Sequence, residues 1–105
     1  MENKKKIEEL QIIEQNLQNL ILQKQNFQVR LMENENALRE LKDNTKQSYK
    51  IIGSIMVAED NDKLIKELNE EKDILNLRIK NIEKQENIIR EKANKIQEEV
   101  MNNLK

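Results

Sequence analysis

Carboxylates and cationic side chains are the chemistry-bearing residues of this chain, with 20 Asp and Glu set against 19 Lys and Arg in 105 residues. Paired carboxylates can perform acid–base catalysis or hold a metal, but here they alternate with Lys and Arg at helical spacings, which is typical of solvated ion pairs. The chain has no His, no Cys and a single Gly, so it lacks an imidazole base, a thiolate ligand and a glycine-rich phosphate loop. No serine lies in a nucleophile-elbow context. We therefore expect no enzyme activity, no cofactor and no metal site.

Composition also argues against nucleic-acid and membrane partners. Proteins that bind single-stranded nucleic acid stack its bases on aromatic side chains, and the only aromatic residues here are Phe27 and Tyr49. The net charge of −1 gives no long-range attraction to phosphate. The basic run at residues 4–6 is interpreted as a solvated helix start. Apolar runs of at most four residues cannot span a membrane, and the polar N-terminal residues do not resemble a signal peptide. The absence of Cys fits a reducing compartment. Together with the short apolar runs, it predicts a cytoplasmic protein without membrane contact.

Two long segments carry the heptad periodicity of coiled coils. In the first segment, eight of ten seam positions are apolar: Leu10, Ile13, Leu17, Leu20, Phe27, Leu31, Leu38 and Leu41. In the second, nine of twelve are apolar: Ile65, Leu68, Leu75, Ile79, Ile82, Ile89, Ala93, Ile96 and Val100. We predict helices over residues 1–44 and 60–105. Asn44 is a candidate left-handed C-terminal residue of the first helix, and Asp60 or Asn61 is the predicted N-cap of the second.

The block between the helices follows a different pattern. Residues 48–58 place β-branched side chains around Gly53 and Ser54, which predicts a two-residue hairpin with positive φ at Gly53 in a type II′ turn. The predicted pairs are Ile52 with Ile55, Ile51 with Met56, Lys50 with Val57, and Tyr49 with Ala58. Both faces are then apolar and both edges are open, so the hairpin requires cover from other chains.

The hairpin reverses the chain and makes the helices antiparallel. Lys24 then falls between Ile82 and Glu86, and Asn34 falls near Lys72. These polar residues on the seam have two interpretations. The lysines can extend their ammonium groups to water, or the polar layers can fix the register of the two helices.

The order helix, strand, Gly, strand, helix resembles the β-type subunit of prefoldin. The resemblance is carried by Ser48-Tyr-Lys-Ile-Ile-Gly-Ser-Ile-Met-Val57, by Leu75-Asn-Leu-Arg-Ile-Lys-Asn-Ile-Glu-Lys-Gln-Glu86 and by Gln23-Lys-Gln25, and it covers nearly the whole chain. It implies one domain over residues 1–105, mainly α, in which an antiparallel coiled-coil hairpin carries a central β-hairpin that joins an inter-subunit β-barrel. Ser54 stands where eukaryotic β-type subunits often have Pro, which favours an archaeal type.

The resemblance also implies a function. Prefoldin is a hexamer of two α-type and four β-type chains that holds unfolded polypeptides without ATP and passes them to a group II chaperonin. The implied assembly residues are Tyr49, Ile51, Ile52, Gly53, Ile55, Met56 and Val57. The implied client-binding residues near the termini are Ile7, Leu10, Ile12, Ile13, Leu17, Ile96, Val100, Met101 and Leu104.

Two alternatives stay open at this point. Ile12, Met101 and Leu104 lie off the seam and are expected to contact clients, whereas the seam members near the termini can simply close the coiled coil to its end. The chain can also be a structural coiled-coil adaptor or tether with no chaperone role. The adaptor interpretation predicts a dimer or trimer of long helices and leaves the β-hairpin unexplained.

Overall fold

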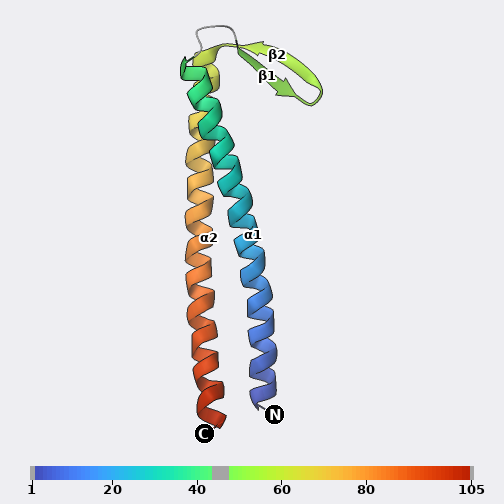
Figure 1. Cartoon of the computed structure of the whole chain (residues 1–105), viewed down its shortest axis with the longest axis vertical. Coiled ribbons are helices and arrows are strands. Elements are labelled where there is room, and N and C mark those ends of the chain that lie inside the picture. The colour runs from blue at the N-terminus through green and yellow to red at the C-terminus, as the bar shows by residue number, and fades with distance from the viewer. Residues whose placement is uncertain (1, 44–47, 105) are drawn as a thin grey trace. The chain divides into compact units, whose positions relative to one another are not determined.

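The computed structural model describes residues 2–43 and 48–104 (Figure 1). Helix α1 (Glu2–Asp43) is followed by strands β1 (Ser48–Ile52) and β2 (Ile55–Glu59) and by helix α2 (Asn61–Leu104). The predicted fold class is confirmed: two long helices are joined through an antiparallel two-stranded hairpin. The predicted helix bounds differ from these by one residue at each described end. Asn44, the candidate C-terminal residue of the first helix, lies outside the described residues.

The chain divides into two compact units, each built from part of both helices. The first contains residues 1–26 and 79–105, and the second contains residues 27–78. In the first unit the buried apolar side chains are Ile13, Ile79, Ile82 and Ile96. In the second they are Leu38, Leu64 and Leu75.

The heptad prediction is confirmed in both units. Every predicted seam position is buried or half-buried except Asn103, the last, polar position of the second heptad series, which is exposed. The amide of Asn103 instead donates a hydrogen bond to Asn3 Oδ1 at 3.0 Å. Lys6 Nζ lies 3.2 Å from Glu99 Oε2, so two polar contacts join α1 and α2 beside the chain termini. The periodic apolar stripe therefore forms the interface between the helices, because burying the apolar face of each helix is favourable.

The hairpin has the predicted register. Ile52 pairs with Ile55, Ile51 with Met56, Lys50 with Val57, and Tyr49 with Ala58. Gly53 has a φ of 62°, and no described non-glycine residue has a positive φ. A type I′ turn needs positive φ at both central residues, whereas type II′ needs it only at the first. The turn at Gly53 and Ser54 is therefore type II′.

The start of α2 is fixed by local polar contacts. The Leu64 N–H donates to the Asp60 carbonyl at 3.0 Å, which makes Asp60 the N-cap residue. The buried Ser48 hydroxyl donates to Asn61 Oδ1 and so ties the first residue of β1 to the first turn of α2. Glu59 Oε1 lies 3.0 Å from Lys63 Nζ, and this hydrogen-bonded carboxylate raises the pKa of Lys63.

Candidate interaction surfaces

The β-hairpin exposes apolar side chains on both faces. Tyr49, Ile51, Ile52, Ile55 and Met56 are each more than half exposed, and Val57 is 38% exposed. By alternation, Tyr49, Ile51 and Met56 share one face, and Ile52, Ile55 and Val57 share the other. An apolar sheet with water on both faces is unfavourable, because neither face gains from burial. All six side chains singled out from the sequence are thus available to another chain.

The hairpin also has unpaired edges. Within the described residues β1 and β2 pair only with each other, so the outer edge of each strand presents free N–H and C=O groups. An isolated two-stranded hairpin is marginally stable in water. Strands from other chains can satisfy these edges and cover the apolar faces in the same step.

The second candidate surface lies beside the termini, within the unit of residues 1–26 and 79–105 (Figure 1). Four of the nine predicted residues are well exposed: Ile7 at 46%, Ile12 at 58%, Met101 at 61% and Leu104 at 71%. Leu10, Leu17 and Val100 are half-buried, and Ile13 and Ile96 are buried. The structure therefore separates the predicted set into an exposed group and a group inside the seam. We call the four exposed residues the terminal apolar group.

Further exposed apolar residues lie away from the termini, and the heptad analysis did not single them out. They are Leu22, Val29, Met32, Ile74, Leu77 and Ile88. All occupy off-seam heptad positions, and this spacing is the signal that would have found them. They provide an internal comparison for the terminal apolar group, since their exposure is similar and their location differs.

A polar layer interrupts the seam at Lys24. Lys24 Nζ lies 3.0 Å from Glu86 Oε1 and donates a hydrogen bond to Glu86 Oε2 at 3.2 Å. Glu86 is buried, and Arg90 Nη2 lies 3.9 Å from its Oε2. In the other unit Asn34, also buried, donates from Nδ2 to the Leu68 carbonyl at 3.0 Å. Both contacts join α1 to α2, as a register-fixing layer requires.

Phe27 adopts the predicted seam position and is half-buried. The guanidinium carbons of Arg30 and Arg78 lie 6.0 Å and 5.7 Å from the centre of its ring. Arginine stacks favourably on aromatic faces at this distance. The ring thus serves the helix interface, which agrees with its assignment to the core.

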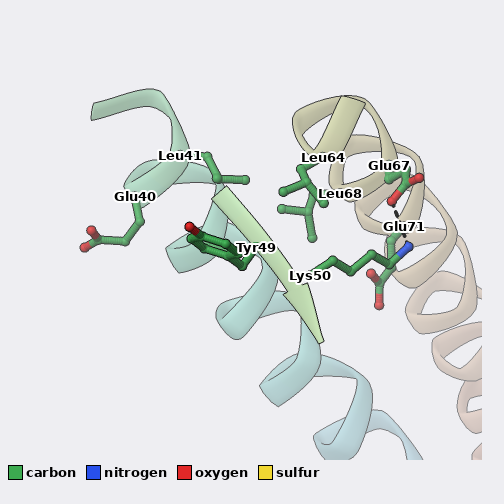
Figure 2. A pocket seen from close by; sticks show the side chains of 9 residues that line it. Glu40, Leu41, Tyr49, Lys50, Leu64, Glu67, Leu68 and Glu71 are labelled. Carbon is green, nitrogen blue, oxygen red and sulfur yellow. Dashed lines mark hydrogen bonds and ion pairs between the residues drawn. The ribbon is translucent and has the colours of Figure 1, made fainter. Parts of the chain in front are cut away.

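A groove of about 420 Å³ lies inside the unit of residues 27–78, where β1 faces both helices. Figure 2 shows Tyr49 of β1 on the side of α1 with Leu41, and Lys50 extending toward Glu67 of α2, with Leu64 and Leu68 of α2 between them. Lys50 Nζ lies 3.1 Å from Glu67 Oε2. The sequence did not point to this groove, because its walls come from three elements that the hairpin brings together.

The described residues contain no cluster of metal-ligating side chains. No group of three or more His, Cys, Asp or Glu side chains within them is placed to hold a metal ion. No helix within residues 2–43 and 61–104 is long and apolar enough to cross a membrane. What this part of the chain does present is an open β-hairpin and exposed apolar side chains beside the termini. The fold and its surfaces define a class of protein, an antiparallel two-helix coiled coil with an open, apolar β-hairpin.

Comparison with known proteins identifies that class. The profile of the family described as "Prefoldin subunit" matches residues 4–105. The prefoldin subunit beta of Archaeoglobus fulgidus is 36% identical over 98 residues, covering 91% of this chain and 84% of that protein. The prefoldin subunit beta of Pyrobaculum islandicum is 33% identical over 90 residues, covering 84% of this chain and 72% of that protein.

Solved structures agree with the sequence comparison. The crystal structure of the prefoldin beta subunit from Thermococcus strain KS-1 superimposes with a TM-score of 0.92 at 28% identity, over 99% of this chain and 93% of that one. The beta2 subunit of the same strain shares the fold, with a TM-score of 0.74 at 20% identity, over 90% of this chain and 99% of that one. The chain belongs to the prefoldin subunit family and is similar to its archaeal β-type members. Membership implies a chaperone-type function, in assembly with other prefoldin subunits, and prefoldin subunits are not enzymes.

Proposed function

We propose that this chain is the β-type subunit of an ATP-independent holdase, which captures unfolded polypeptides at its terminal apolar group and passes them to a group II chaperonin. The observation that carries the proposal is the exposure of Ile7, Ile12, Met101 and Leu104 beside both termini, each between 46% and 71% exposed. Apolar contact is non-directional and so suits clients with no common sequence. Met101 adds a flexible side chain of the kind common on promiscuous binding surfaces.

The buried members of the predicted set have a different role in this proposal. Ile13 and Ile96 close the coiled coil, and Leu10, Leu17 and Val100 become available to a client only when the helix ends fray. Polar contacts from Lys6 to Glu99 and from Asn103 to Asn3 hold the ends together, and both are exposed and therefore weak. A client can thus meet first the terminal apolar group and then, after fraying, the seam.

Assembly in this proposal uses the β-hairpin. Two α-type and four β-type chains form a hexamer, in which hairpins of different chains merge into β-barrels and the coiled coils extend from them. The support is the combination of open strand edges and two exposed apolar faces, which strand addition between chains buries. We place this complex in the cytoplasm, where client and chaperonin meet.

The test compares two sets of four substitutions in the assembled complex. The first set changes Ile7, Ile12, Met101 and Leu104 to Gln. The matched control changes Leu22, Val29, Leu77 and Ile88, which are 55–66% exposed and lie away from the termini, also to Gln. Both sets preserve the seam and use a good helix former.

The readout is light scattering by a chemically unfolded test protein diluted into each complex without nucleotide. We expect the terminal set to lose suppression of aggregation and the control set to keep it, with native mass unchanged in both. Deletion of residues 1–12 and 97–105 is expected to have the same effect as the terminal set. Full suppression by the terminal set, or equal loss in both sets, would refute the client-binding assignment.

A further inference from the structure

Met101 is the one sulfur-containing side chain of the terminal apolar group. The chain has four Met and no Cys, His or Trp, so its thioethers are the side chains that peroxides oxidise most readily. Three of the four methionines lie within the described residues, and all three are well exposed: Met32 at 64%, Met56 at 66% and Met101 at 61%. They lie on three different surfaces of the chain.

The surroundings of Met101 leave its sulfur open to a small oxidant. Met101 lines a shallow recess of about 560 Å³ near the end of α2, together with Asn94, Gln97, Glu98 and Asn102. All four neighbours in this recess are polar, so no apolar or aromatic side chain among them covers the thioether. Leu104, three residues further along α2, lies on the same side of the helix.

We propose that Met101 is a reversible oxidation site at which a peroxide lowers the affinity of the chaperone for its clients. In the forward step the thioether sulfur attacks one peroxide oxygen, the S–O bond forms, the O–O bond breaks, and the second oxygen leaves with both protons as water. The sulfur is oxidised by two electrons and the peroxide is reduced. In the reverse step a dithiol reductant, acting through a methionine sulfoxide reductase, removes the oxygen as water and becomes a disulfide. The inference rests on the proposed function, because it concerns the surface that clients contact.

Oxidation changes Met101 from an apolar to a polar side chain at the place where apolar contact is required. The S–O dipole holds water through hydrogen bonds, and a client can cover it only by removing that water. The sulfoxide also loses the apolar character that makes a flexible methionine useful on a promiscuous surface. Met101 and Leu104 are the exposed apolar side chains of the last turn of α2, so oxidation removes one of the two.

The other two exposed methionines provide controls within the same chain. Met32 lies in the unit of residues 27–78, away from the termini, so its oxidation leaves the terminal apolar group intact. Met56 lies on a face of the β-hairpin that the proposed assembly covers, so we expect it to react more slowly in the complex.

The experiment uses the full chain in its complex, treated with hydrogen peroxide that is then removed with catalase. Mass spectrometry of peptides measures the sulfoxide fraction at each methionine. Light scattering by an unfolded test protein, added after the peroxide is removed, measures suppression of aggregation. We expect Met32 and Met101 to be oxidised at similar rates and Met56 more slowly. The concentration of complex needed for half suppression should rise about threefold, the size expected when part of the apolar contact of one methionine is lost. Methionine sulfoxide reductases with dithiothreitol should reverse the rise.

Two variants identify the residue responsible, and each is compared with itself before peroxide treatment. Met101→Leu keeps an apolar side chain of similar size without sulfur, so peroxide should leave its suppression at its own starting level. Met32→Leu is the matched control, and it should lose suppression on oxidation as the wild type does. Native mass should be unchanged by peroxide in all three complexes.

The proposal is wrong if Met101 stays reduced while Met32 is oxidised, if complete oxidation of Met101 leaves suppression unchanged, or if Met101→Leu loses suppression as the wild type does. A fall in native mass on oxidation would assign the loss to assembly and would equally overturn the proposal. The four Gln substitutions of the terminal apolar group separate this test from that of the proposed function. If that set loses suppression and oxidation has no effect, only the oxidation site is refuted. If that set keeps suppression, the client-binding assignment itself is refuted.

Discussion

Removing Lys24 is expected to destabilise the chain more than removing any exposed lysine, because its partner Glu86 is buried. The Glu86 side chain is 8% exposed and that of Lys24 is 23% exposed, with 3.0 Å between Lys24 Nζ and Glu86 Oε1. In the variant Lys24→Met the carboxylate keeps only Arg90, whose Nη2 lies 3.9 Å from Glu86 Oε2. A buried charge without a close partner is costly, since it has lost its hydration shell.

The magnitude follows from the burial of the two partners. Breaking a fully buried pair costs about 3–5 kcal/mol, and partial exposure of Lys24 together with the remaining Arg90 contact reduces the expected loss to about 2 kcal/mol. The double variant Lys24→Met with Glu86→Leu removes both charges and fills the seam with apolar groups. We expect its stability to be within about 1 kcal/mol of the wild type, or higher. The two sites are therefore strongly coupled.

The assay is urea unfolding followed by far-UV circular dichroism at one protein concentration, because assembly makes stability depend on concentration. Lys6→Met is the matched control. Lys6 is 25% exposed and pairs at 3.2 Å, but its partner Glu99 is 58% exposed, so the expected loss is below about 0.5 kcal/mol. If Lys24→Met costs no more than Lys6→Met, or if the double variant is as unstable as the two single changes added together, the buried-pair argument is wrong.

Three further outcomes are expected. The variant Asn34→Leu removes a buried Oδ1 that accepts no hydrogen bond from the described residues, and it also loses the one hydrogen bond to the Leu68 carbonyl. We expect the free energy of unfolding, measured in urea, to rise by about 1 kcal/mol. A clear fall would contradict this. In Gly53→Val the added Cβ meets no atom within 4 Å, but a β-branched residue is forced to a φ of +62°. We therefore expect impaired assembly, measured as native mass. A complex of normal mass would refute the turn assignment. Glu59→Gln should lower the pKa of Lys63 in an NMR titration, because the carboxylate that stabilises the ammonium form is removed; an unchanged pKa would contradict this.

The polar seam positions resolve into two behaviours that the sequence left open. Lys24 forms an ion pair with buried Glu86 across the helix interface, which supports a register-fixing layer. Lys72 is half-buried, and its Nζ lies 4.0 Å from the exposed carboxylate of Glu35, so its ammonium reaches the surface as a solvated lysine does. The same residue type at equivalent heptad positions thus plays different roles, because the opposite helix presents a buried carboxylate in one case and an exposed one in the other.

The elements of this chain were predictable because their signals are local. Heptad spacing fixed which side chains face the partner helix, since the α-helical repeat brings positions three and four apart to one face. Gly53 marks a two-residue turn. A turn of that length sets Ile52 opposite Ile55, and every later pair of the two strands follows from this first pair. The family resemblance rested on the same residues and is confirmed by the comparisons.

What only the tertiary structure decided is which side chains remain in contact with water. The heptad pattern places Ile65 on the seam and Leu64 off it, yet Leu64 is buried at 8% exposure and Ile65 is only half-buried, because Leu64 lies where β1 and both helices meet. The groove beside β1 exists only because β1, α1 and α2 meet in space, and no periodic pattern encodes that approach. Sequence alone therefore determined the helices, the hairpin and their register, through short-range geometry. The packing of side chains between the two helices, and beside β1, decided which apolar groups stay exposed to a partner.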